Sequence, residues 1–200
     1  MIGKSHLSHL GVLCLLSSLL NGDENVEYFS ACSGGEYATV KRLVAEQPEL
    51  VHSTTNDGEH CLHLIAISGN ADIAKLLLSQ GADANVRSKW ENGLRMHPLS
   101  WSTYYGRYDL ITLLLESGAD VNADFDIGRT ESGTAEAATA LDVIEQILVT
   151  LDDEGDEKER FLRTRNALVK AVQCSETIFG GQSLLHIAGW FIKFSQALQP

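Results

Sequence analysis

The chain has 200 residues, of which 44% are hydrophobic, and a mean hydropathy of -0.05, so it has enough apolar residues to build a core. This composition excludes a disordered chain, and three prolines without a Gly-X-Y period exclude the proline-rich and collagenous classes. The net charge of -12 and the pI of about 4.9 predict repulsion from phosphates and anionic membrane surfaces, which argues against a nucleic-acid partner.

The N-terminal segment, residues 1–22, contains an apolar run. Residues 11–20 read GVLCLLSSLL, ten residues without a charge. The run is too short to span a bilayer as a helix, but it suits the apolar part of a secretory signal peptide. No A-x-A-like pair follows Leu20, so a helix that covers the open end of the fold is an equal alternative. The predicted compartment is the cytoplasm or, if residues 1–22 are a signal peptide, the secretory pathway.

A sequence pattern recurs at a distance of 37 residues. Residues 73–85 read IAKLLLSQGADAN and residues 110–122 read LITLLLESGADVN. Each copy follows a glycine, Gly69 or Gly106, and an apolar segment stands before each glycine. Three-to-four spacing of apolar residues on both sides of Gly69 predicts two antiparallel helices joined by a turn. A fixed period of this length indicates a repeat architecture.

Three motifs in these segments resemble the ankyrin repeat family, whose unit of about 33 residues is a β-turn and two helices with a TPLHxA signature. HCLHLIA at 60–66 and SLLHIA at 183–188 keep most of the signature, and HPLSWST at 97–103 keeps its proline and leucine. The resemblance covers residues 24–195 and is strongest over 56–123. It implies an all-α fold, an ankyrin-repeat α-solenoid of about four to five repeats, in which β-hairpin-like fingers join the helix pairs.

The predicted repeat domain covers residues 23–200. The connections at 86–97 and 123–139 exceed the family's unit by four and about nine residues, which predicts two long fingers. Thr139 and Ser183 are predicted to cap helices, and five apolar residues of the fourth unit are predicted to share one helix face. These five are Phe161, Leu162, Leu168, Val169 and Val172. The predicted units are 24–55, 56–86, 87–123, 124–175 and a partial unit at 176–200.

Candidate chemistry along the chain is sparse. His60, Cys61 and His63 lie within four residues, but no third or fourth metal ligand is nearby, and the resemblance implies that His63 and His186 are structural. The acidic run at 152–157 is predicted to be a solvated turn, with acids suited to the start of the next helix. No phosphate-binding loop, nucleophile elbow or metalloprotease helix occurs, so we expect no enzyme activity, no cofactor, no metal and no small-molecule substrate.

The four cysteines lack the close pairs of a zinc knuckle or a redox dithiol, and they are interpreted as separate buried thiols. They are Cys14, Cys32, Cys61 and Cys174. Removal of residues 1–22 would leave three, an awkward number for an oxidising compartment.

A basic and aromatic segment marks the predicted binding face. Between Arg87 and Arg107 four basic residues accompany a single acid, and Trp90 lies on the long finger. Arginine, tryptophan and tyrosine dominate interface hot spots, although Trp90 could instead fold over its own finger. The resemblance implies that fingertips and the inner face of the first helices bind a partner. The residues at these positions are Asn56, Asp57, Glu59, Ile67, Ser68, Arg87, Lys89, Trp90, Arg95, Met96, Tyr104, Tyr105, Asp124, Phe125 and Asp126.

The expected function is that of a non-catalytic scaffold that binds a protein. Two alternatives remain open. The apolar residues at 190–194 could support self-association or contact with a membrane surface, although apart from the N-terminal segment the chain is not expected to contact membranes. The chain could also be a regulatory part of a larger protein.

Overall fold

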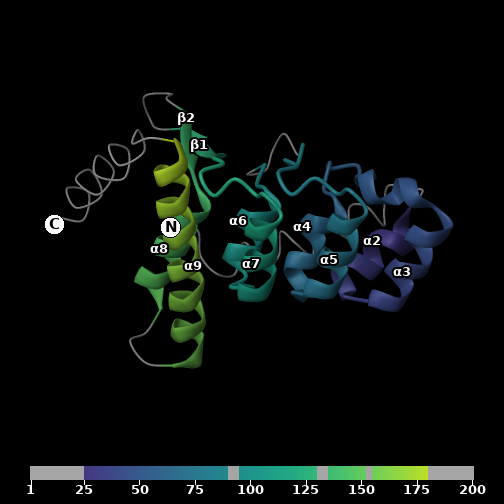
Figure 1. Ribbon diagram of the computed structural model, residues 1–200, viewed down its shortest axis with the longest axis horizontal. Helices are drawn as coiled ribbons and strands as arrows, with labels where there is room; N and C mark the ends of the chain where they lie inside the picture. Colours follow the sequence, from purple (N-terminus) through teal and green to yellow (C-terminus); the bar gives the residue numbers. More distant parts are fainter. Residues whose placement is uncertain (1–24, 90–94, 130–134, 152–154, 180–200) are drawn as a thin grey trace.

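The computed structural model describes residues 25–89, 95–129, 135–151 and 155–179 (Figure 1). Within these ranges the chain forms a row of antiparallel helix pairs, with a two-stranded sheet between the third and fourth pairs. The elements are α2 (Val26–Gly34), α3 (Tyr37–Glu46), the 3₁₀ helix η1 (Pro48–His52), α4 (Cys61–Ser68), α5 (Ala71–Ser79), α6 (Pro98–Tyr104), α7 (Tyr108–Glu116), β1 (Phe125–Arg129), β2 (Ala135–Ala138), α8 (Ala140–Thr150) and α9 (Asp156–Phe179).

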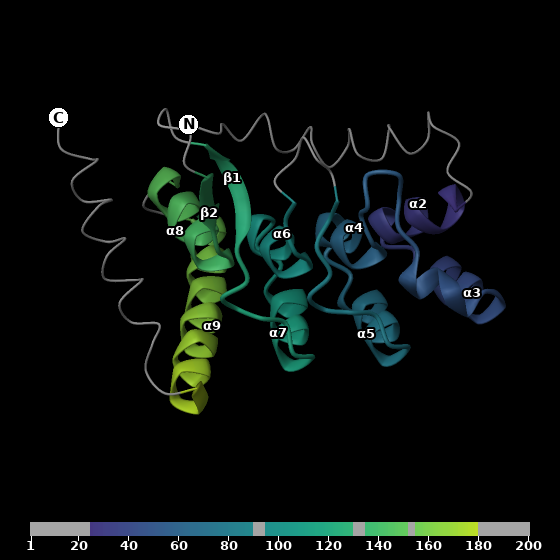
Figure 2. The same ribbon diagram turned by 90° about the horizontal axis from the view of Figure 1, so that it is seen from above.

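The helices form two layers along the length of the molecule (Figure 2). The first helices of the pairs, α2, α4, α6 and α8, lie in one layer, and the second helices, α3, α5, α7 and α9, lie in the other. Consecutive helices within each layer pack on one another, as do the two helices of a pair. The predicted stack of helix pairs is therefore present.

The core lies between the layers and between consecutive pairs. Ile73 and Leu77 of α5 have no exposed surface, and neither do Leu110 and Leu114, which lie 37 residues further along in α7. Burial of each such side chain contributes about 1.5–3 kcal/mol to folding. The repeated apolar pattern of the sequence is thus the pattern of the buried face.

Side-chain hydrogen bonds cap the starts of α5 and α8. The Asn70 side chain accepts the amide hydrogens of Asp72 and Ile73 at the start of α5, at 3.1 and 3.3 Å. Thr139 caps α8, since its hydroxyl accepts from the Asp142 amide while the Asp142 carboxylate accepts from the Thr139 amide. This confirms the predicted cap at Thr139.

The fourth unit departs from the simple repeat. Its long finger is an antiparallel hairpin, in which β1 pairs with β2 and Phe125 lies opposite Ala138. Helix α9 begins at Asp156, with three acids in its first turn as predicted, and has 24 residues.

The prediction of the apolar face of α9 is wrong for one of its five residues. Phe161, Leu168 and Val172 are buried, but Leu162 is 41% exposed. Leu162 follows Phe161 directly, and a step of one residue turns a helix by about 100°, so the two cannot share the buried face.

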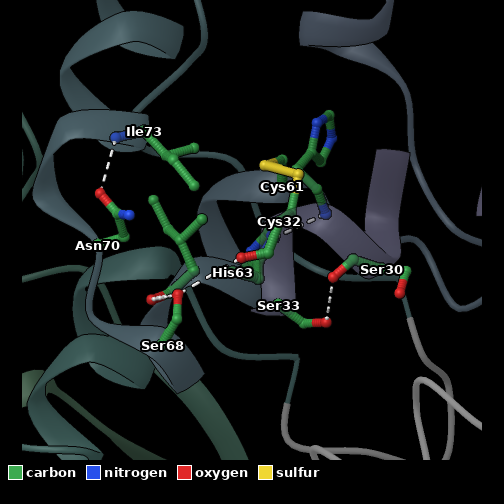
Figure 3. The surroundings of a disulfide bond; sticks show 10 residues. Ser30, Cys32, Ser33, Cys61, His63, Ser68, Asn70 and Ile73 are labelled. Carbon is green, nitrogen blue, oxygen red and sulfur yellow. Dashed lines mark hydrogen bonds between the residues drawn. A yellow bond between two sulfur atoms is a disulfide. The ribbon is translucent and has the colours of Figure 1, made fainter. Parts of the chain in front are cut away.

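A disulfide joins Cys32 of α2 to Cys61 of α4 (Figure 3). The interpretation of the cysteines as separate buried thiols is therefore wrong for this pair, and Cys174 is exposed. The two cysteines are 29 residues apart in sequence, but stacking of α2 on α4 brings their Cα atoms within 5.5 Å. Cys14 lies outside the described residues.

Gly106 offers a test of the contact between the third and fourth pairs. It has a φ of 63°, and a Cβ there would lie 2.9 Å from the Phe161 ring, whereas Gly118, with a φ of 88°, has nothing within 4 Å. We expect Gly118→Ala to lower the free energy of unfolding by about 1 kcal/mol, through backbone strain. Gly106→Ala should lower it by about 2–3 kcal/mol, because overpacking against Phe161 adds to that strain. Urea denaturation followed by circular dichroism measures both; equal losses would contradict the role of the Phe161 contact.

Candidate partner-binding face

The second finger is a tight hairpin before α4. Thr54 and His60 form an isolated antiparallel bridge, and the Thr55 amide donates to the Glu59 carbonyl at 2.9 Å. The third finger is the connection between α5 and α6. A Cβ on Gly58 would lie 2.6 Å from the Cβ of Lys89, so the second fingertip lies directly against the third finger. Neighbouring fingers therefore form one continuous edge.

His63 holds this edge together. Its Nδ1 accepts the His60 amide hydrogen at 2.9 Å, which leaves the ring proton on Nε2 to be donated to the Val86 carbonyl, 3.2 Å away. Desolvation by burial lowers the pKa of His63 to about 3, so the ring is neutral. The structural role expected for His63 is confirmed, whereas His186 lies outside the described residues.

Glu59 lies under the finger and not at its surface. It is buried, its Oε2 is 3.4 Å from Nδ1 of His63, and Ser88 of the third finger hydrogen-bonds its carboxyl group. Burial is the main reason why its pKa rises to about 8. A carboxylate there would face a nitrogen lone pair, so the pair is neutral near pH 7. Glu59 is thus a finger-bracing residue, and the expectation that it contacts a partner is wrong.

Met96 and Phe125 are likewise buried. They form a small apolar cluster with Ala138, and Trp101 and Tyr104 pack against it. The cluster fixes the β1–β2 hairpin to α6, so its two large side chains serve as internal anchors. The expectation that Met96 and Phe125 present side chains to a partner is wrong, because a fingertip hydrophobe can bury itself against its own helix pair.

The predicted basic segment is partly neutralised. Asp126 lies 3.4 Å from Arg87 and 3.6 Å from Arg95, and Arg87 also donates to the Arg95 carbonyl. Arg107 turns inward and donates to the carbonyls of Ala66 and Ile67.

Lys89 keeps an exposed position on the third finger, and Arg95 and Asp126 are half-exposed. The surface where the third finger meets the β1–β2 hairpin therefore carries charges of both signs.

An aromatic group lies on α6 beside these charges. Trp101 stacks on Tyr105 with ring centroids 6.2 Å apart, and Tyr104 meets both rings edge-on. All three side chains are partly exposed, and the Trp101 Nε1 is buried without a hydrogen-bond partner. The site prediction omitted Trp101, although a tryptophan at a core leucine position of the signature was a signal for it.

The other predicted contact residues divide by exposure. Asn56 and Asp124 are exposed, whereas Asp57, Ile67 and Ser68 are partly buried. Trp90, the apolar residues 190–194 and the N-terminal segment lie outside the described residues. Over the described ranges, no group of three or more histidine, cysteine or acidic side chains could hold a metal ion. None of the helices described is long and apolar enough to cross a membrane.

Comparison with known proteins decides the family. Residues 28–124 match the model of ankyrin repeats, in three copies. The chain is an ankyrin repeat protein. The predicted family and the predicted all-α solenoid are both confirmed.

Relatives of this ankyrin repeat protein match it over part of their length. The chain is 31% identical over 104 residues to ankyrin repeat and SAM domain-containing protein 6 of Rattus norvegicus, which is 52% of this chain and 11% of that protein. It is 33% identical over 103 residues to the probable E3 ubiquitin-protein ligase XBOS33 of Oryza sativa subsp. japonica, 50% of this chain and 19% of that one. The match to the serine/threonine-protein kinase VIK of Arabidopsis thaliana is 40% identical over 55 residues, 28% of this chain and 13% of the kinase. The chain thus spans less than a fifth of the length of each of these relatives.

The buried pair of Glu59 and His63 predicts opposite effects of pH on stability. The pKa of Glu59 is raised by folding, so its contribution is full below about pH 4.5 and is lost as the pH rises through about 8. The pKa of His63 is lowered by folding, so its contribution is full above about pH 6.5 and is lost as the pH falls towards 3. As the pH rises from 6 to 8, the free energy of unfolding of the Glu59→Gln variant should therefore increase by about 2 kcal/mol relative to that of the natural protein.

Thermal and urea unfolding at several pH values measure this gain. Glu49→Gln is the matched control, because Glu49 is exposed on η1. A Glu59→Gln variant whose stability keeps a constant offset from the natural protein at all pH values would contradict the neutral buried carboxyl group.

Proposed function

We propose that the chain is a non-catalytic scaffold that binds a protein partner through its fingers and the inner face of its first helices, centred on α6. Ankyrin repeats are generally protein–protein interaction modules, which supports the proposal at the level of the family. The kinase and ligase activities in the relatives' names are not carried over, since the chain matches 19% or less of those two proteins.

The observation that carries the proposal is the grouping of partly exposed aromatic rings with exposed charges where the third repeat meets the β1–β2 hairpin. Tyr104 packs against the Met96–Phe125 cluster, and the charged residues Arg95 and Asp126 are the chain neighbours of that cluster. Tyr105 stacks on Trp101 next to them. Rings that are already held in place lose little conformational freedom on binding, and a rim of both charge signs suits a polar protein surface.

A paired test separates this face from the opposite layer. In the first variant Lys89→Glu is combined with Tyr105→Ala. In the control Lys75→Glu is combined with Tyr37→Ala, which changes an exposed lysine and a 38% exposed tyrosine on α5 and α3. Partners are captured from a native extract and quantified by mass spectrometry.

The first variant should lose a specific set of captured proteins by about tenfold or more, since removing a hot-spot side chain costs roughly 2 kcal/mol. The control should keep them, and both variants should unfold within a few degrees of the natural protein. Equal capture by the two variants would refute the assignment of the binding face to α6 and the fingers.

A further inference from the structure

The disulfide lies at the interface between the first two described repeats. Cys32 belongs to α2, and Cys61 is the first residue of α4 (Figure 3). The two residues are 0% and 2% exposed. The bond therefore crosses, inside the core, the surface on which the α2–α3 pair docks against the α4–α5 pair.

Within the described residues, two side-chain hydrogen bonds cross this surface. Asn70 donates its side-chain amide to the Gly35 carbonyl at 2.9 Å, and the Ser68 hydroxyl donates to the Cys32 carbonyl at a long 3.4 Å. The Tyr28 hydroxyl of α2 is buried without a hydrogen-bond partner, which opposes docking.

The next interface is held differently. The Asn85 side chain donates to the Gly118 carbonyl at 2.9 Å and accepts from the Asp120 amide at 2.7 Å, which joins the GADAN turn to the GADVN turn. Arg107 adds its two bonds to the carbonyls that end α4. The first repeat has no such turn, since α3 is followed by the 3₁₀ helix Pro48–His52.

We propose that the Cys32–Cys61 disulfide is a redox latch that keeps the first repeat docked on the second. Each unit of a solenoid is stabilised mainly by its neighbours, and within the described residues the α2–α3 pair packs on one neighbouring pair. A covalent link between the two compensates for the missing polar contacts. Reduction releases α2 and α3, and the repeats from α4 onward stay folded.

The latch is set by thiol–disulfide exchange. The two thiols lose two protons and two electrons, and a low-molecular-weight or protein disulfide accepts them and leaves as two thiols. A dithiol reductant runs the same exchange in reverse. Because both sulfurs are buried, a reductant reaches them only when the interface opens, so reduction of the folded protein is slow.

The latch also bears on the compartment. Disulfides persist in oxidising compartments. This agrees with the interpretation of residues 1–22 as a signal peptide.

Hydrogen exchange with mass spectrometry tests the latch on the full chain. We compare the oxidised protein with the same protein held in a phosphine reductant. Closing a loop of about 30 residues restricts the open chain by a factor of several hundred in the entropic model, so amides of residues 26–46 should exchange about 100-fold faster after reduction. Amides of residues 98–116 should change by less than about twofold, because their interfaces keep all their bonds.

Two variants serve as controls. Cys32→Ala with Cys61→Ala should reproduce the reduced pattern without any reductant. Cys174→Ser should behave like the natural protein in both states, because the exposed Cys174 is not part of the bond.

Three results would overturn the latch. The first is alkylation of Cys32 and Cys61 as thiols in folded protein prepared without reductant. The second is unchanged exchange of residues 26–46 on reduction, and the third is an equal rise along the whole chain. None of these results depends on whether the proposed partner-binding face is correct.

Discussion

Side chains of one repeat hydrogen-bond the backbone of the next, and the stack depends on these bonds. Its helices are short, from seven residues in α6 to eleven in α8 before the longer α9, so most of their backbone groups belong to unpaired ends. Helices of this length are unstable alone. The Asn70 side chain donates a hydrogen bond to the Gly35 carbonyl, and the Asn85 side chain donates one to the Gly118 carbonyl. His63 donates in the same way to the Val86 carbonyl. Each repeat therefore completes the ends of its neighbour while it buries the neighbour's apolar face.

Buried side chains hold the fingers in place in the same way. The imidazole of His63 is neutral because it is buried, and the Glu59 carboxyl group beside it stays protonated for the same reason. Both groups brace the second finger against the third, and the Met96–Phe125 cluster braces the hairpin against α6. A surface that is already ordered keeps more of its contact energy on binding. Side chains that sequence patterns assign to contact, such as Glu59 and Phe125, thus position the exposed residues around them.

The sequence predicts features that depend on local pattern and misses those that depend on packing between distant segments. The helix pairs, the Thr139 cap and the role of His63 follow from spacing and signature. Glu59 lies at a fingertip position of the signature, but its burial depends on the neighbouring finger, which covers it. The disulfide was missed for a similar reason, because Cys32 lies in a degenerate repeat whose alignment with Cys61 becomes visible only when the helices are stacked.

The interface that carries the disulfide differs from the interfaces on either side of α6. A change at the first interface therefore need not affect the proposed binding face. Stability in a repeat stack is approximately a sum of units and nearest-neighbour contacts, so a change at one interface is felt mainly by the units it joins. The aromatic group of α6 lies between α4 and α8, both of which pack on α6. Once its disulfide is reduced, the first repeat can therefore open without moving Tyr104 or Tyr105. The chain can tie the order of its outer repeat to the redox state and keep its proposed binding face unchanged.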